Sequence, residues 1–156
     1  MKILVFSDSH KTIGNMYDAI EAERPDRVFH LGDHIRDAQD LAYAFTTLDI
    51  LYVPGNCDYA FDASPNALIE LGGVRIFLTH GHLFGVKSGL NRLESEARRL
   101  GADLALFGHT HRAHCEEKNG LHLVNPGSCG GVSSHPSYAV ITIENKRISC
   151  EIRNID

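Results

Sequence analysis

The chain of 156 residues lacks several features that would each assign it to a particular class. It has no run of 18 apolar residues, and Met1-Lys2-Ile3 leads directly into a predicted strand, so neither a membrane-spanning helix nor a signal peptide is expected. The four cysteines show no C-x-x-C spacing, which gives no support for a zinc ribbon or a redox motif. We therefore expect a cytoplasmic protein with reduced thiols and no membrane partner.

Basic residues are also few relative to acidic ones. The 15 lysines and arginines are outnumbered by 20 aspartates and glutamates, and the formal net charge is −5. This balance disfavours long nucleic acid as a partner, because such binding relies on many basic side chains, but it leaves a small phosphate ester compatible. With no internal repeat and no low-complexity tract, the length predicts one domain over residues 1–156. The sequence does not determine the oligomeric state.

Histidine is the residue that the chain has in excess, with ten in all. Four of them form two H-x-H pairs, and the second pair follows Gly108 and the apolar run 104–107, a pattern typical of a buried strand that ends at a site. Four other apolar runs also end before residues that can bind metal ions. In chain order, the residues after these five runs are Asp8 and His10, Asp33, Asn56, His80 and His82, and finally His109 and His111.

The positions of these residues predict a shared metal site. Ligand sites in α/β sheets lie beyond the carboxyl ends of the strands, so all five strand ends are expected to meet in one crevice. Carboxylates, an amide and several imidazoles suit Mn²⁺, Fe²⁺, Ni²⁺ or Zn²⁺ better than Mg²⁺ or Ca²⁺. Seven ligands are too many for one tetrahedral catalytic ion, which favours two ions that share a bridging carboxylate. The predicted reaction is therefore hydrolysis of a phosphate ester.

Strand and helix patterns alternate in the first half of the chain and predict a parallel sheet. The second helix is predicted from residue 35 to 48, with Ala38, Leu41, Ala42 and Phe45 on its buried face, and a third is predicted after Ser88 as N-cap. The later strands are joined by hairpin signals at Gly72-Gly73, Asn119-Gly120 and Asn145-Lys146. Because these strands outnumber what one sheet needs, we predict an α/β fold with two packed sheets, a β-sandwich flanked by helices.

Taken together, five motifs resemble in order the signature blocks of the calcineurin-like metallophosphoesterases. They are Asp8-Ser9-His10, Gly32-Asp33, Gly55-Asn56-Cys57-Asp58, His80-Gly81-His82 and Gly108-His109-Thr110-His111. The third block, the short length and Asn125-Pro126-Gly127-Ser128 look most like the small single-domain phosphodiesterases of bacteria and archaea. The resemblance implies an αββα sandwich and a phosphoric ester hydrolase, with a phosphodiester preferred over a monoester. It also implies two divalent ions and a metal-bound hydroxide as nucleophile, with manganese expected and nickel, iron or zinc as alternatives.

The same resemblance implies a role for each residue of the site. One ion takes Asp8, His10 and His111, the other takes Asn56, His80 and His109, and Asp33 bridges the two. Asn56 is also expected to act catalytically by orienting a phosphate oxygen. Many family members have histidine at the next position, where this chain has Cys57, a neutral thiol expected to border the substrate. His82 is the candidate for the missing catalytic histidine, although the sequence does not establish that replacement.

Other readings stay open. A eukaryotic retromer subunit resembles these proteins in its small fold but acts as a non-catalytic scaffold for partner proteins. Such a scaffold is the alternative function for this chain. A nuclease is disfavoured by the acidic charge. His30 is expected to be a hydrogen-bonded core residue, His34 to approach the site, and the segment 85–89, with two glycines, to gate or bind substrate. The sequence names neither the physiological substrate nor the metal used in the cell.

Overall fold

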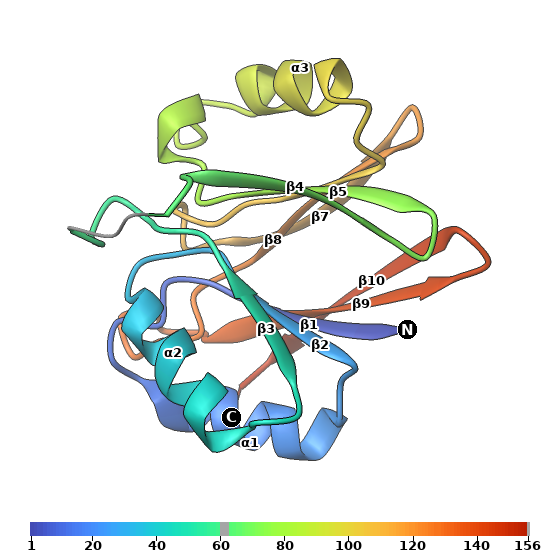
Figure 1. Ribbon diagram of the computed structural model, residues 1–156. Helices are drawn as coiled ribbons and strands as arrows, with labels where there is room; N and C mark the ends of the chain where they lie inside the picture. The colour runs from blue at the N-terminus through green and yellow to red at the C-terminus, as the bar shows by residue number, and fades with distance from the viewer. Residues whose placement is uncertain (60–62, 156) are drawn as a thin grey trace.

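Two five-stranded sheets pack face to face in the computed structural model, which describes residues 1–59 and 63–155 (Figure 1). The first sheet has the order β10-β9-β1-β2-β3 and the second the order β4-β5-β6-β8-β7. The predicted α/β sandwich is confirmed. The strands are β1 (Lys2–Phe6), β2 (Arg27–His30), β3 (Asp49–Tyr52), β4 (Asn66–Leu71), β5 (Val74–Thr79), β6 (Leu104–Leu106), β7 (Ala113–Lys118), β8 (Leu121–Pro126), β9 (Ser137–Glu144) and β10 (Arg147–Asn154).

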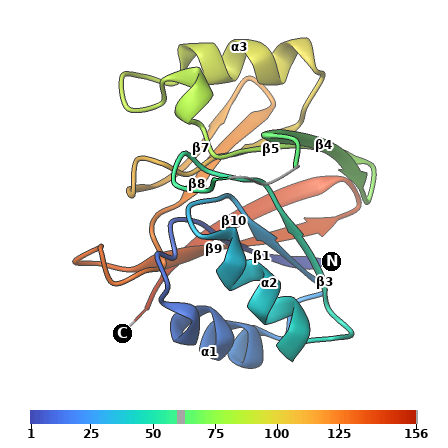
Figure 2. The same ribbon diagram turned by 60° about the vertical axis from the view of Figure 1, so that its left-hand side comes forward.

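Helices cover the outer faces of both sheets (Figure 2). The helices α1 (Ile13–Glu23) and α2 (Ile35–Ala44) lie against the first sheet, whereas the short 3-10 helix η1 (His82–Phe84) and α3 (Asn91–Arg99) lie over the second. The strands β1, β2 and β3 are parallel, as are β5 and β6. Parallel strands joined by helices end at one edge of a sheet, so the loops that follow these five strands lie close together.

Alternating side chains of β1 pack into two different hydrophobic cores, one on each face of the first sheet. Ile3 and Val5 belong to the core between the two sheets, whereas Leu4 and Phe6 pack with the helices on the outer face. All four are buried, and burial of each such side chain contributes on the order of 1.5–3 kcal/mol. A strand buried on both faces needs an uninterrupted apolar run, which is why its period-two pattern is absent from the sequence.

The three predicted hairpin turns are confirmed. Gly72-Gly73 joins β4 to β5, Asn119-Gly120 joins β7 to β8, and Asn145-Lys146 joins β9 to β10. Both central residues of each turn have positive φ, between 49° and 79°, as a type I′ turn requires. These turns fix the register of the three antiparallel pairs.

Two predicted helix boundaries and one buried position are wrong. The second helix ends at Ala44 and not at Leu48, because Phe45 leaves the helical conformation with φ −113° and places its ring 4.8 Å from that of Tyr17. Ala42 is exposed. Ser88 does not cap the third helix, since its N–H bonds the carbonyl of Gly85 in a preceding turn, and the helix begins three residues later. No helix among the described residues is long and apolar enough to cross a membrane.

Candidate metal centre

The predicted site residues occupy the loops that follow β1, β2, β3, β5 and β6. A first group consists of Asp8, His10, Asp33 and His111, each of which offers a ligand atom within 4.8 Å of the others. Nε2 of His111 lies 3.1 Å from Oδ1 of Asp8, and Nε2 of His10 lies 3.9 Å from Oδ2 of Asp33. Both carboxylates are buried.

A second group gathers around the buried ring of His80. Its Nε2 lies 3.0 Å from Oδ1 of Asn56, 3.2 Å from Nδ1 of His109 and 3.6 Å from Oδ1 of Asp33. Asp33 thus directs Oδ1 toward the second group, while its Oδ2 is the oxygen nearest His10 of the first. This placement of one carboxylate between two groups is what a pair of neighbouring cations would require.

The donor set fits cations because its lone pairs face one another. Nδ1 of His80 lies 2.8 Å from the carbonyl oxygen of Leu31, a pure acceptor, so in the neutral ring the proton is on Nδ1 and Nε2 presents a lone pair. That nitrogen faces the side-chain oxygens of Asn56 and Asp33, which are also acceptors. In the first group, Oδ1 of Asp8 and Nε2 of His10 are buried without a hydrogen-bond partner in the described chain. A divalent ion would satisfy all of these atoms.

Hydrogen bonds orient the two carboxylates. Oδ2 of Asp8 accepts from the hydroxyl of Ser7 at 2.6 Å and from the backbone N–H of His109 at 3.1 Å. Oδ1 of Asp33 accepts from the backbone N–H of Cys57 at 2.9 Å. A side chain at Gly55 would occupy the space of the Asp33 carboxylate, which explains the glycine that precedes Asn56. Each acid is therefore fixed in direction before any ion binds.

The protonation states also suit a metal site. Burial opposes ionisation of Asp8, but contacts with His111, His80 and Ser7 outweigh it and lower the pKa of this carboxyl. Burial and the neighbouring His80 lower the pKa of His109 to about 4. The site thus holds a carboxylate and a neutral imidazole at neutral pH, the forms that bind metal ions.

The backbone is strained at five of the seven proposed ligands. Positive φ angles, between 44° and 68°, occur at residues that are not glycine, a conformation that costs energy and persists only where the surroundings impose it. Such strain is concentrated at functional sites. The five residues are Asp8, His10, Asp33, His109 and His111.

Two acidic residues that support the site were missed by the sequence analysis. Asp58 accepts backbone N–H bonds from His34 and Ile35, both at 3.0 Å, and from Gly55 at 2.9 Å, and so ties the loop after β3 to the start of α2. Its place in the Gly-Asn-Cys-Asp motif was the only available signal. No sequence signal pointed to Asp37, because its pattern is that of an ordinary helix residue.

Asp37 belongs to a buried chain of hydrogen bonds behind the metal ligands. Its Oδ2 accepts from the hydroxyl of Ser9 at 2.7 Å, and that hydroxyl lies 3.0 Å from Nε2 of His30. Nδ1 of His30 accepts from the N–H of Gly32 at 3.2 Å, so Nε2 carries the proton. Burial lowers the pKa of His30 to about 4. The expectation that His30 is a hydrogen-bonded core residue is confirmed.

The remaining predicted residues lie at the rim of the site. Cys57 is exposed, and desolvation together with the Asp33 carboxylate raises the pKa of its thiol to about 11, so it is neutral. The ring of His82 lies 5.4 Å from that of His80, and its buried Nδ1 has no hydrogen-bond partner in the described chain. The ring of His34 lies 5.5 Å from that of His10, so His34 does approach the site.

Known proteins resemble the chain over most of its length. The sequence model of the calcineurin-like phosphoesterase superfamily domain matches residues 1–146. A probable metallophosphoesterase of Bacillus subtilis is 36% identical over 153 residues, covering 93% of this chain and 86% of its own. A phosphodiesterase of Methanocaldococcus jannaschii is 27% identical, covering 94% of this chain and 95% of its own.

A solved structure gives a comparison of the fold alone. Vps29 of Entamoeba histolytica superimposes with a TM-score of 0.79 at 24% identity, covering the whole of both chains. At that level of identity the similarity concerns the arrangement of the sheets and helices and carries no statement about the chemistry of the site.

Proposed function

The chain belongs to the calcineurin-like phosphoesterase superfamily, and from that premise we propose that it hydrolyses a small phosphodiester with the help of two divalent metal ions. The observation that carries the proposal is the place of Asp33, which has one oxygen toward each of two groups of potential ligands. One ion is proposed at Asp8, His10 and His111, the other at Asn56, His80 and His109, with Asp33 shared. Manganese is the proposed ion, with nickel, iron or zinc as alternatives, and the cytoplasm is the proposed location.

Each part of the site has a proposed task. When bound, the ions would supply positive charge opposite the phosphoryl oxygens and activate water. Asn56 is exposed and can turn its amide N–H toward a phosphate oxygen while its Oδ1 stays with His80. Cys57 borders the substrate as a neutral thiol. His82 is proposed to exchange a proton with the leaving group.

Two observations favour a diester with a good leaving group. The relative from Methanocaldococcus jannaschii is named a phosphodiesterase. The thiol of Cys57, with its pKa raised to about 11, is a weak proton donor to a departing alkoxide. An ester whose leaving group departs as a stable anion needs less of that help.

Metal reconstitution tests the proposal. The purified protein is stripped of metal, Mn²⁺, Ni²⁺, Zn²⁺ or Mg²⁺ is added back singly, and turnover of an aryl phosphodiester is compared with that of its monoester. We expect metal-dependent turnover that favours the diester, that is lost in Asp33→Ala and that is kept in the matched control Asp40→Ala, an exposed aspartate of α2. The bound ions are counted by elemental analysis.

The alternative is a protein-interaction scaffold on the same fold, as in the retromer subunit. It would be favoured by two bound ions without turnover of any aryl ester. It would be favoured further if Asp8, Asp33 and His109 could each be replaced by alanine without changing the cellular phenotype. The relatives make the enzyme the better supported of the two, because the protein of Bacillus subtilis is named a probable metallophosphoesterase and that of Methanocaldococcus jannaschii a phosphodiesterase.

A further inference from the structure

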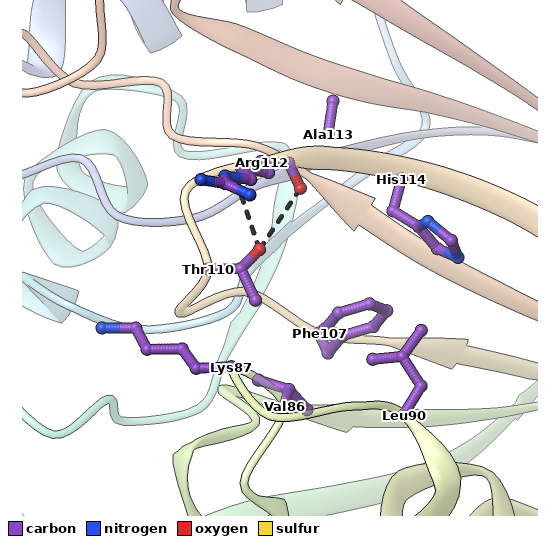
Figure 3. Close-up of a pocket in the computed structure, with 8 residues that line it drawn as sticks. All are labelled: Val86, Lys87, Leu90, Phe107, Thr110, Arg112, Ala113 and His114. Carbon is purple, nitrogen blue, oxygen red and sulfur yellow. Dashed lines mark hydrogen bonds between the residues drawn. The ribbon is translucent and has the colours of Figure 1, made fainter.

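Beside the proposed metal centre the surface is hollowed into a pocket of about 570 Å³ whose lining includes none of the metal ligands (Figure 3). One wall is the segment after η1, which carries Val86 and Lys87, and the other is the loop between β6 and β7, which carries Thr110 and Arg112. Thr110 stands between His109 and His111 in the chain, so the pocket adjoins the metal centre. Its volume is typical of a site for one small molecule.

The floor of the pocket is apolar. Phe107 and Val86 are almost fully buried, and Leu90 continues the apolar surface toward one end. At the same end stands the ring of His114, 6.2 Å from the ring of Phe107 and tilted by 56°. Phe107 is only 1% exposed and so forms part of the floor, whereas the side chain of His114 is 38% exposed and offers a flat face on which a planar organic group can stack.

The other end of the pocket is cationic. Lys87 and Arg112 enter from opposite walls, and their charged groups lie toward the same end (Figure 3). Within the described residues neither side chain forms an ion pair, although the chain as a whole carries a formal charge of −5. Two cations without a partner protein anion suit an anionic ligand.

The cationic end lies next to the metal ligands. Thr110, which lines the pocket, stands between His109 and His111 in the chain, and Arg112 directly follows His111. A phosphate between Lys87 and Arg112 would lie on the metal side of the pocket.

The wall that carries Arg112 is rigid. The hydroxyl of Thr110 accepts from the side-chain amide of Asn125 at 3.0 Å and from the backbone N–H of Arg112 at 3.2 Å. Asn125 is fully buried, and its amide also donates to the carbonyl of Gly108 at 2.9 Å. The same hydrogen bonds fix the loop that carries His109 and His111, so they also fix the position of the pocket relative to the metal centre.

We propose that this pocket binds the organic arm of the substrate, and that the substrate is a small nucleotide-type phosphodiester with one planar heteroaromatic arm. The phosphate lies at the cationic end beside the metal centre, and the planar arm lies over the apolar floor against the ring of His114. The proposal rests on the proposed function and specifies its substrate class. The volume of the pocket fits one small arm of the substrate.

Two substrates with the same leaving group test the proposal. The p-nitrophenyl ester of thymidine 5′-monophosphate carries a planar arm, whereas methyl p-nitrophenyl phosphate carries none, and both release p-nitrophenolate. With manganese-loaded protein we expect kcat/KM to be at least about 5-fold higher for the thymidine ester, since this is the lower end of what stacking of one base typically contributes. His114→Ala should lower this ratio by about 3-fold to 10-fold.

Lysine variants test the cationic end. Lys87→Met should lower kcat/KM for both esters by about 10-fold, because the phosphate is common to both, mainly through a higher KM. The matched control is Lys146→Met in the turn between β9 and β10, which should change neither value. Thermal unfolding of each variant shows that the fold is kept.

The outcomes separate this proposal from the proposed function. Equal kcat/KM for the two esters, or equal effects of Lys87→Met and Lys146→Met, would overturn the pocket assignment while hydrolysis itself stood. If neither ester were hydrolysed, the proposed function would fail. Calorimetric titration of the manganese-loaded protein with thymidine 5′-monophosphate would then test whether the pocket binds a nucleotide. Binding that Lys87→Met weakens would support it, and absence of binding would overturn it.

Discussion

The two sheets contribute different chemistry to the crevice between them. The loops after β1, β2 and β3 of the first sheet supply both acids and the amide, as well as one imidazole, that of His10. The loops after β5 and β6 of the second sheet supply imidazoles alone, those of His80, His82, His109 and His111. The negative charge of the site therefore comes from one sheet, and the other supplies nitrogen donors, among which His109 is neutral because its pKa is lowered to about 4.

This division teaches how the site and the fold depend on each other. A cation between Asp33 and His80 would bind a residue of each sheet and so hold the two layers together at their open edge. Without a cation, Asp8 and Asp33 contact the second sheet through histidine ring nitrogens and through the backbone N–H of His109. Changes on the acidic side should therefore affect activity most, whereas changes in metal content should affect how firmly the sheets are joined.

The largest effect should come from removing charge on the acidic side. Asp33→Ala should lower kcat/KM for an aryl phosphodiester by on the order of 10³-fold, whereas His109→Ala, which removes one neutral donor, should cost about 10-fold to 100-fold. Both variants are measured at saturating Mn²⁺ against Asp40→Ala. A greater loss of kcat/KM in His109→Ala than in Asp33→Ala would contradict the view that the acidic side contributes most to activity.

The next effect concerns His30, the histidine of the first sheet that cannot bind metal because both ring nitrogens are hydrogen-bonded. Its pKa is about 4 in the fold and near 6.5 in the unfolded chain, so the unfolded state binds more protons between these values. The free energy of unfolding should therefore fall by roughly 3 kcal/mol as pH drops from 7 to 4.

Urea unfolding of chelator-treated protein at several pH values measures this slope. His30→Gln keeps polar atoms at the position but cannot be protonated, so its stability should depend less on pH by about the same amount. Equal slopes for the two proteins would show that His30 is not the group that couples acidity to stability. The comparison uses slopes, so any constant loss of stability in the variant does not affect it.

Metal binding itself should produce a somewhat smaller gain in stability. At a free Mn²⁺ concentration about 100-fold above the dissociation constant, the folded state should gain about 2.7 kcal/mol, or roughly 5–10 °C in Tm. Differential scanning calorimetry with Mn²⁺ and with chelator measures the shift. Asp8→Asn should lose much of it, and a full shift in that variant would contradict the role of the first sheet in binding the ion.

The smallest effect should come from Asp58, which supports the acidic side from behind. Asp58→Ala leaves three backbone N–H groups without their acceptor and should cost about 1–2 kcal/mol of stability. Asp58→Asn keeps one acceptor oxygen and should cost less. Both are measured by urea unfolding beside Asp40→Ala, a change on the helix α2 whose first N–H groups Asp58 accepts. A loss of stability in that control equal to the loss in Asp58→Ala would remove the argument for a specific cap.

Local patterns were sufficient for much of the fold. The three hairpin turns and the strand at the start of the chain each depend on interactions between near neighbours, and all were predicted. Strand order was not predicted, because the pairing of β1 with β9 joins residues far apart in the chain. The end of α2 was missed for the same reason, since the contact of Phe45 with Tyr17 decides it.

The candidate site shows the same limit. The motifs named the residues of both ligand groups because each follows a strand directly, but they gave no sign of Asp37, whose role depends on Ser9 of another loop. The pocket beside the metal centre was visible only as a glycine-containing segment at residues 85–89. Its cations, Lys87 and Arg112, lie on separate segments and form no motif.

The position of β1 also bears on how the chain is synthesised. This strand lies in the middle of its sheet, with β2 on one side and β9 on the other, and it pairs Lys2 with Thr142. A nascent chain that has not yet reached β9 leaves one edge of β1 unpaired, and an apolar strand edge is a template for association with other chains. The first sheet is thus completed only after β9 has been synthesised, and products truncated before β9 should be prone to aggregate.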